Sequence, residues 1–159
     1  MNIRSLQAND QKEVVKILAG HPLQFPKFII EKYPIRWDYF LNSSTENINC
    51  QFYVAFNENN EIIGQAGLLF NAEEGLFEIV GVAVKKGVQR QGIGKALIST
   101  ICNCVRHMNE KMIILYTLGH IGNEDTILFY RNIGFELINY EKDFFSSEYH
   151  RVTFIKNLV

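Results

Sequence analysis

The order of the predicted helices and strands places this 159-residue chain in the α+β class, with helices around a mixed central sheet. Three observations support that class. Turn residues separate strand-like segments in the first half, an amphipathic helix follows a glycine-rich turn, and a continuous apolar strand comes after that helix. The predicted order is β-α-α-β-β-β-α-β-α-β-β, which we expect to form a single domain over residues 1–159.

The chain begins with a short strand and two helical segments. Residues 3–6 alternate like a strand, and the pair Asn9-Asp10 then offers a cap for a helix whose apolar face ends near Ala19. A second helical segment covers residues 28–41, is interrupted by Pro34 and is rich in aromatic residues.

Three strands follow a polar loop. Residues 51–56 and 61–70 read as strands joined into a hairpin by the turn residues 57–60. The third strand, residues 75–84, contains Gly81, and a glycine inside a strand indicates a bulge or the close approach of another backbone.

The second half contains two helices and three strands. The first helix, residues 93–108, carries an apolar stripe with spacings of four and finally three positions: Ile93, Leu97, Ile101, Val105 and Met108. Residues 112–117 form a continuous apolar strand, which is typical of burial on both faces. A short helix starts at Asn123 or Asp125 and ends at Gly134, and residues 135–140 and 151–155 are closing strands.

Composition limits the class of function. A hydrophobic content of 47% is enough for a packed core, and a net charge of -1 provides no general field that would attract nucleic acid. We see no secretory signal and no apolar run of the ~20 residues that a membrane span needs. The three cysteines have no zinc-ligand spacing, so we expect no metal and a reducing cytoplasm.

The turn before the helix at residue 93 has the features of a phosphate-binding loop. It reads Gln89-Arg90-Gln91-Gly92-Ile93-Gly94-Lys95, and four cations with no acid lie between residues 84 and 96. Glycines allow close approach of the backbone, and unpaired N–H groups at a helix start point at an anion. The alternative is a simple tight turn between strand and helix.

The turn does not match the patterns of two common nucleotide-binding loops, and each mismatch is at a single position. A Walker loop needs Lys directly after its second glycine, where this chain has Ile93. A dinucleotide fingerprint needs a glycine or small residue where this chain has Leu97.

The longer pattern resembles the GCN5-related N-acetyltransferases, the GNAT family. Its elements are Gln-x-x-Gly-x-Gly after a valine-rich strand, Asn123, and the block from Phe129 to Phe135. The resemblance extends from residue 3 to about 152 and is specific between residues 78 and 135. It implies the acyl-CoA N-acyltransferase fold, a central mixed sheet of six to seven strands flanked by about four helices.

The resemblance implies acetyl-CoA as co-substrate and assigns residues to it. The pyrophosphate would be held by Gln89, Arg90, Gln91, Gly92, Ile93, Gly94 and Lys95. The pantetheine arm would lie along the free strand edge at Val82, Ala83 and Val84, where a backbone N–H near Val82 polarises the thioester carbonyl. Asn123 would bond the arm, and Phe129 and Tyr130 would contact it from the following helix.

Two residues are candidates for acid–base catalysis. Glu78 lies in an apolar strand, 14 residues before Gly92, where the histone-acetylating branch of the family has its catalytic glutamate. The alternatives are that strand alternation places Glu78 on a solvated face, or that a water chain is the base. The resemblance makes Tyr130 the acid that protonates the departing thiolate; the alternative is a packed core aromatic.

The implied activity is transfer of an acetyl group to a primary amine. With no Cys in the site motifs, we expect direct transfer in a ternary complex. The alternative is a non-catalytic CoA-binding sensor or interaction module of the same fold. Dimerisation is common in the family, so a homodimer is one expected assembly.

The acceptor, a small molecule or a peptide amine, is not identified by the sequence. His120 is a candidate base or simply a loop residue. Aromatic residues of the second helical segment would line an acceptor pocket or pack that helix: Phe28, Tyr33, Trp37 and Tyr39. Acids in the same region would attract a cation or lie at the solvated surface: Glu31, Asp38 and Glu46.

Overall fold

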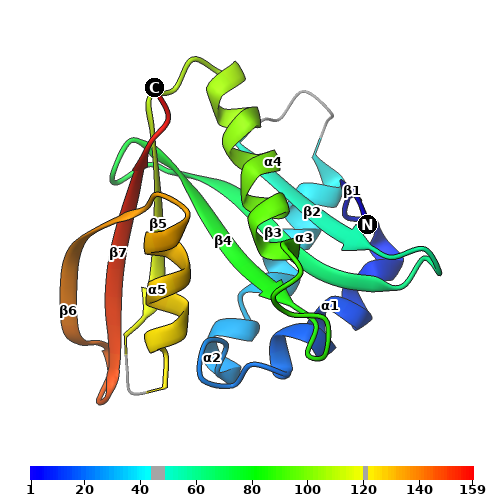
Figure 1. Ribbon diagram of the computed structural model, residues 1–159, viewed down its shortest axis with the longest axis horizontal. Coiled ribbons are helices and arrows are strands. Elements are labelled where there is room, and N and C mark those ends of the chain that lie inside the picture. Colours follow the sequence, from blue (N-terminus) through cyan, green and yellow to red (C-terminus); the bar gives the residue numbers. More distant parts are fainter. Residues whose placement is uncertain (44–48, 120–121) are drawn as a thin grey trace.

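A single seven-stranded sheet in the order β1-β2-β3-β4-β5-β7-β6 runs through the computed structural model, which describes residues 1–43, 49–119 and 122–159 (Figure 1). The strands are β1 (Asn2–Ser5), β2 (Cys50–Phe56), β3 (Ile62–Asn71), β4 (Leu76–Val84), β5 (Met112–Leu118), β6 (Glu136–Ser146) and β7 (Tyr149–Asn157). Only β4 and β5 pair in parallel. The sheet is therefore mixed, as the sequence predicted.

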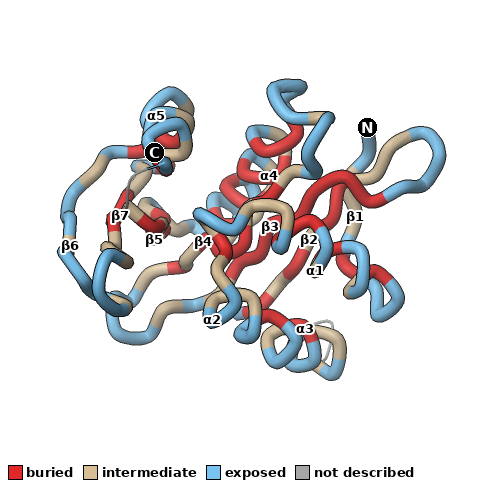
Figure 2. The backbone as a smooth tube through the Cα atoms, turned by 90° about the horizontal axis from the view of Figure 1, so that it is seen from below, coloured by how far each residue is buried: buried red, intermediate tan, exposed pale blue. Residues whose placement is uncertain are grey.

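Helices cover both faces of the sheet. They are α1 (Gln11–Ala19), preceded by a 3-10 turn η1 (Ala8–Asp10), then α2 (Lys27–Ile30), α3 (Tyr33–Asn42), α4 (Ile93–His107) and α5 (Glu124–Asn132). Figure 2 shows α4 on one side of the buried central strands and α1, α2 and α3 on the other. No helix in the described part of the chain is both long and apolar enough to cross a membrane.

Two buried clusters correspond to the two faces. One cluster packs the apolar stripe of α4 against Phe77, Ile79 and the aromatic ring of Tyr130. The other packs Val14, Leu18 and Trp37 from the first helices against Phe52 and its strand neighbours. The predicted α4 stripe is confirmed at Ile93, Leu97, Ile101 and Val105, which are all at most 3% exposed, whereas Met108 follows the helix and is partly buried.

Two predicted elements are corrected. The predicted helix over residues 28–41 is two helices, because Pro34 occupies the first turn of α3, where its missing N–H breaks no helical hydrogen bond. The predicted strand over residues 135–140 continues to Ser146 as β6. Most of β6 is exposed on both faces and its register shifts against β7, so its second half lacks apolar alternation.

The sheet splits in its middle, between β4 and β5. These strands pair only from Phe77 to Ile79 against Ile113 to Leu115, and then diverge. Figure 1 shows β4 running away from β5 and β7 toward the end of the molecule where α2 lies. The edge of β4 beyond Ile79 is therefore unpaired on the side of β5.

The predicted bulge at Gly81 is confirmed. Gly81 has a φ of +65°, and the register of β3 on β4 shifts between Gln65 and Gly67. The fully buried side chain of Gln65 donates from Nε2 to the Gly81 carbonyl oxygen at 2.8 Å, and its Oε1 accepts from Trp37 Nε1 at 2.8 Å. This hydrogen-bonded chain fixes the strand at the point where the sheet opens.

Candidate active site

The glycine-rich turn forms one wall of a cavity of about 480 Å³. Gly92 precedes α4 with a φ of +80° and supplies no side chain to cap the helix, so the first N–H groups of α4 have no capping partner from it. A Cβ at Gly92 would meet no atom within 4 Å, which leaves open space directly beside the helix start. The geometry suits an anionic group, since unpaired N–H donors and the helix dipole act together there.

Most of the residues assigned to acetyl-CoA by the resemblance line this cavity. They are Val82, Ala83, Val84, Gln89, Arg90, Gly92, Ile93, Gly94, Lys95, Phe129 and Tyr130. Of the four cations near the turn, Arg90 and Lys95 line it, while Lys85 lies 3.8 Å from Glu61 in an ion pair. Gln91 instead lines a separate hollow beside Met1.

Asn123 has a structural place outside both main cavities. Its Nδ2 donates to the carbonyl oxygens of Leu23 and Leu118, each at 3.0 Å, so it joins the α1–α2 connection to the end of β5. Its Oδ1 is buried and has no hydrogen-bond partner among the described residues. Only this Oδ1 is left for the predicted bond to a pantetheine arm.

Several residues that line this cavity were not predicted from the sequence, among them His21, Gln24 and Thr126. His21 Nε2 lies 2.6 Å from the Val84 carbonyl oxygen, at the end of the β4 edge. Gln24 donates to Thr126 Oγ1, which links the same connection to α5 across the opening of the sheet. These contacts join residues 63 and 102 positions apart, so no local pattern could have indicated them.

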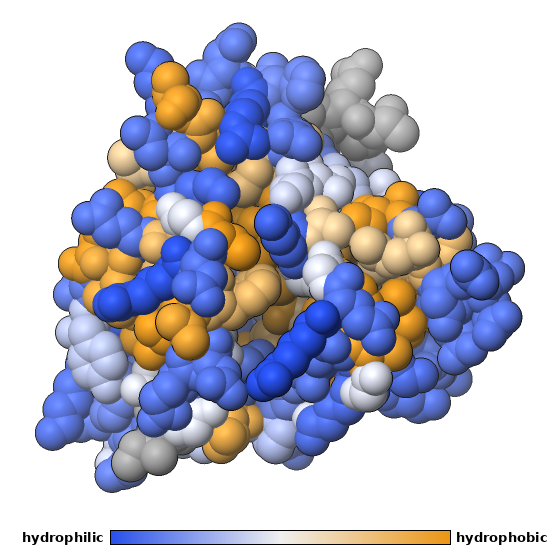
Figure 3. Space-filling view, in the orientation of Figure 1, coloured by the Kyte–Doolittle hydropathy of each residue, from blue (hydrophilic) through white to orange (hydrophobic). Residues whose placement is uncertain are grey.

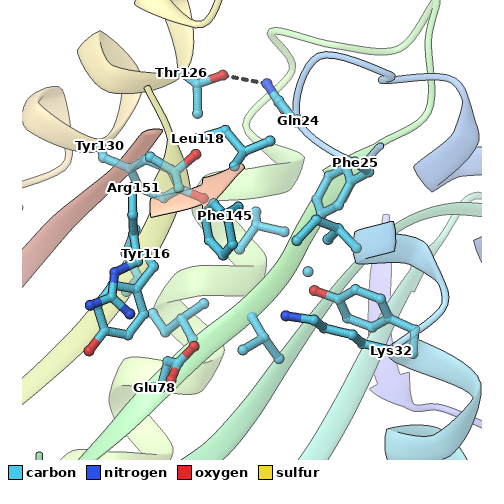
Figure 4. Close-up of a pocket in the computed structure, with 18 of the residues that line it drawn as sticks. Gln24, Phe25, Lys32, Glu78, Tyr116, Leu118, Thr126, Tyr130, Phe145 and Arg151 are labelled. Carbon is cyan, nitrogen blue, oxygen red and sulfur yellow. Dashed lines mark hydrogen bonds between the residues drawn. The ribbon is translucent and has the colours of Figure 1, made fainter. Parts of the chain in front are cut away.

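A second cavity of about 270 Å³ lies on the other side of this link, between β4, β5, the α2–α3 region and the β6–β7 hairpin. Figure 4 shows Glu78, Tyr116 and Arg151 on one side of it, Lys32 and Phe25 on the other, and the Gln24–Thr126 bond at one end. In Figure 3 the surface is hollowed near its centre, in the region between α5 and the start of α4 in Figure 1, with apolar atoms at the bottom and both hydrophilic and apolar residues around the rim.

Glu78 lines this second cavity in a mostly buried position. Burial is the main cause that raises the pKa of its carboxyl group. Asn71 Nδ2 donates to Glu78 Oε1 at 3.1 Å, and this bond and the charges of Arg36, Arg151 and Lys32 act in the opposite direction, lowering the pKa. A carboxylate with a raised pKa has the protonation behaviour of a general base.

Tyr130 has its ring in the core and lines both cavities. Its ring packs against Phe129, Phe135 and Phe154, with centroids 5.2–5.7 Å apart. Burial, and secondarily the neighbouring Tyr33, raises the pKa of its hydroxyl, which therefore stays protonated at neutral pH. The two interpretations from the sequence, a core aromatic and a proton donor, are compatible.

Of the other candidates in the acceptor region, only some line the second cavity. Tyr33 lines it, Phe28 packs on Phe145 and Tyr149, and Trp37 is buried against Gln65. Glu31, Asp38 and Tyr39 are exposed and do not line it. His120 and Glu46 lie outside the described residues.

The two cavities meet at four shared residues: Gln24, Val82, Thr126 and Tyr130. One cavity has a helix start with unpaired N–H groups, and the other has the mostly buried carboxylate of Glu78. The split in the sheet thus brings a helix start suited to an anion and a largely buried carboxylate to neighbouring cavities along β4.

A sequence model described as an acetyltransferase (GNAT) domain matches residues 49–137. The chain therefore belongs to the GNAT acetyltransferase family, and it is an acyltransferase. A search of curated proteins found no match.

Solved structures share the whole fold at low sequence identity. A GNAT-family protein from Desulfovibrio desulfuricans is 19% identical, with a TM-score of 0.84 and 99% of each chain covered. An aminoglycoside 6'-N-acetyltransferase in complex with coenzyme A is 13% identical, with a TM-score of 0.78 and coverage of 100% and 98%. A variant of the spermidine N-acetyltransferase from Vibrio cholerae is 12% identical, with a TM-score of 0.73 and coverage of 99% and 95%.

Proposed function

We propose that this protein is an acetyl-CoA-dependent N-acetyltransferase that acetylates a primary amine by direct transfer in a ternary complex. The observation that carries the proposal is the junction at Val82 and Tyr130, where the cavity beside the helix start meets the cavity that contains Glu78. Two substrates bound on opposite sides of this junction would have their reacting atoms adjacent.

The residues of the first cavity fit coenzyme A. The helix start at Gly92 offers unpaired N–H groups, and Arg90 and Lys95 add positive charge for a pyrophosphate. The unpaired edge of β4 at Val82, Ala83 and Val84 offers backbone groups to the amides of a pantetheine arm. His21 already contacts the Val84 carbonyl oxygen, so the backbone groups of Val82 are the freer ones on this edge. When bound, acetyl-CoA supplies an activated thioester.

Glu78 has the environment of the base that prepares the amine. An amine is protonated at neutral pH, since its ordinary pKa is about 10. The Glu78 carboxylate would accept that proton directly or through a water molecule. The free amine nitrogen then forms a bond to the thioester carbonyl carbon, the carbon–sulfur bond breaks, and the nitrogen releases its second proton to solvent as the amide forms.

Tyr130 has the position of the acid that completes the reaction. Its hydroxyl would donate a proton to the departing thiolate and regain one from solvent. The described cysteines support direct transfer, because none of Cys50, Cys102 and Cys104 lines either cavity. Burial raises the pKa of the Cys50 thiol to about 11, which keeps it neutral and poorly nucleophilic.

Calorimetric titration of the protein with acetyl-CoA tests the proposal, and a dissociation constant in the micromolar range is expected. Glu78→Gln and Tyr130→Phe then separate the two catalytic roles in an assay of thiol release with an amine library. Each variant should lose about 10²-fold or more of kcat at unchanged acetyl-CoA affinity.

Wild-type kcat in both variants would refute the acid–base assignment. CoA binding without turnover of any amine would favour the sensor or interaction module instead. The homodimer and the cytoplasmic location stay predictions from the sequence.

A further inference from the structure

Two basic side chains form one wall of the cavity that contains Glu78. Lys32 is the residue that caps α3, and Arg36 lies one helical turn later, so both point to the same side. Lys32 Nζ lies 5.8 Å from the centre of the Phe145 ring, and the Arg36 guanidinium lies 5.2 Å from the centre of the Tyr33 ring. Aromatic faces thus hold both cations at the cavity.

Neither cation is neutralised in the described part of the chain. No carboxylate among those residues lies within ion-pair distance of Lys32 or Arg36. The third cation of the lining, Arg151, differs, since its Nε and Nη2 both lie 2.8 Å from Glu141 Oε1. The wall formed by Lys32 and Arg36 is therefore the part of the cavity with unmatched positive charge.

The opposite wall carries the opposite charge. Among the described residues that line the cavity, Glu78 is the one acid, and its carboxyl group is influenced by the charges of Arg36, Arg151 and Lys32. Even with Glu141 counted beside it, cations outnumber carboxylates around the cavity. A polyamine or aminoglycoside would bring further positive charge to a wall that is already cationic.

We propose that the acceptor is a small primary amine that carries a carboxylate, with its amine directed to Glu78 and its carboxylate to Lys32 and Arg36. The inference rests on the proposed acetyltransferase function and names the class of its second substrate. Guanidinium and ammonium donors form charge-assisted hydrogen bonds to a carboxylate, and Arg offers two in parallel. A cavity of about 270 Å³ suits a molecule of amino-acid size.

Binding of such a carboxylate would also assist the base. The charges of Arg36 and Lys32 lower the pKa of Glu78, so a carboxylate that neutralises them would raise it. A substrate with the anionic group would thus make Glu78 a stronger base in the complex that reacts.

A matched set of amines tests the proposal by thiol release from acetyl-CoA. For each skeleton, the set contains the amino acid, its amide, the amine without the carboxyl group, and the diamine. We expect kcat/KM for the amino acid to exceed that for its amide by at least about tenfold, because the charged hydrogen bonds are lost in the amide. Equal or greater kcat/KM for the amide or the diamine would overturn the proposal while leaving the acetyltransferase function intact.

Two variants test whether Lys32 and Arg36 are the cause of the preference for a carboxylate. Lys32→Met and Arg36→Met remove the charge and keep an unbranched apolar side chain, and each should raise KM for the amino acid about tenfold while changing KM for the amide little. Acetyl-CoA affinity should be unchanged, since neither residue lines the first cavity. Lys27→Met, on α2 and outside both cavities, is the matched control. An equal loss for amino acid and amide would indicate a merely structural role and contradict the proposal.

A binding experiment removes the dependence on turnover. N-acetylated amino acids and their amides are titrated into the CoA-bound protein by calorimetry. The acid should bind about tenfold more tightly than the amide, and Arg36→Met should abolish the difference. Indistinguishable affinities, including no binding of either, would refute the carboxylate subsite, whereas failure to bind CoA would refute the proposed function itself.

Discussion

At the scale of single residues, Glu78 combines a functional position with a cost in stability. Burial raises the pKa of its carboxyl group, so the folded protein holds the proton more tightly than the unfolded chain does. The stability linked to this group is therefore greatest at low pH and is lost as pH rises through the unfolded and then the folded pKa. At neutral pH the ionised carboxylate destabilises the fold.

We therefore predict that Glu78→Gln stabilises the protein at pH 7. Each unit of pKa shift corresponds to about 1.4 kcal/mol, and each kcal/mol raises the melting temperature by about 2–4 °C in a protein of this size. The gain should shrink as the pH falls toward about 4, where wild-type Glu78 is protonated. Melting curves of the wild type and the Glu78→Gln variant between pH 4 and 8 measure this gain in stability. Glu136→Gln, at an exposed residue, is the control. A gain independent of pH would argue against this account.

Asn71 should tune the pH dependence of the reaction. Its hydrogen bond to Glu78 Oε1 lowers the pKa of that carboxyl group, so Asn71→Leu should raise it. The acidic limb of the kcat/KM profile would then move to higher pH, because the base becomes unprotonated later. An unmoved limb would mean that Glu78 is not the group that titrates in catalysis.

The sequence predicted those site residues that are unusual for their own element. Glu78 is conspicuous in an apolar strand, and Tyr130 follows a recognisable block. His21, Gln24 and Arg36 gave no such signal, because only long-range folding brings them to the cavities. Asn123 was recognisable in the sequence, whereas the hydrogen bonds of its Nδ2 to the carbonyl oxygens of Leu23 and Leu118 were not predicted.

At the scale of elements, the bulge in β4 depends on the absence of a side chain at residue 81. A Cβ at Gly81 would lie 2.7 Å from Gln65 Nε2 and 2.7 Å from Tyr33 Cε1. The same hydrogen-bonded chain that fixes the bulge would therefore be displaced.

We predict that Gly81→Ala destabilises the protein more than Gly75→Ala does. Both glycines have positive φ, so both substitutions cost about 1–2 kcal/mol of backbone strain. Gly75 has no atom within 4 Å of an added Cβ, whereas Gly81 is crowded, which adds about 1–3 kcal/mol. Urea unfolding of the two variants gives the comparison, and equal losses would show that the bulge tolerates a side chain.

The turn before α4 should bind its ligand partly through charge. Arg90→Gln combined with Lys95→Gln should weaken acetyl-CoA binding about tenfold at low salt, because both residues line the first cavity. The difference in acetyl-CoA affinity between the double variant and the wild type should become smaller in 1 M salt, where the Debye length is about 3 Å. Lys111→Gln, outside that cavity, is the control. If the double variant binds acetyl-CoA with full affinity, the two side-chain charges do not contribute and the anion is held by the backbone N–H groups only.

The helices and strands with strong local patterns were the ones that the sequence predicted most accurately. The α4 stripe and the hairpin of β2 and β3 were predicted close to their bounds. β6 was predicted too short, because a strand exposed on both faces leaves no apolar alternation in the sequence.

At the scale of the whole molecule, the proposed function depends on a sheet in which β4 and β5 are paired at one end and apart at the other. The parallel contact of β4 with β5 stops at Ile79, and β7 lies between β5 and β6. Neither feature has a local signature, so the residue patterns predicted only the strands and a mixed sheet, and the free edge at Val82, Ala83 and Val84 was expected from the family resemblance alone. Because β4 and β5 diverge, the start of α4 and the side chain of Glu78 face two cavities that meet at β4.

A crystal structure of the protein with coenzyme A tests this account most directly. We predict the pyrophosphate at the helix start of Gly92, the pantetheine arm along Val82 and Ala83, and the sulfur at the junction within hydrogen-bonding distance of the Tyr130 hydroxyl. A sulfur that lies away from Tyr130, or a pyrophosphate bound outside the turn, would contradict it.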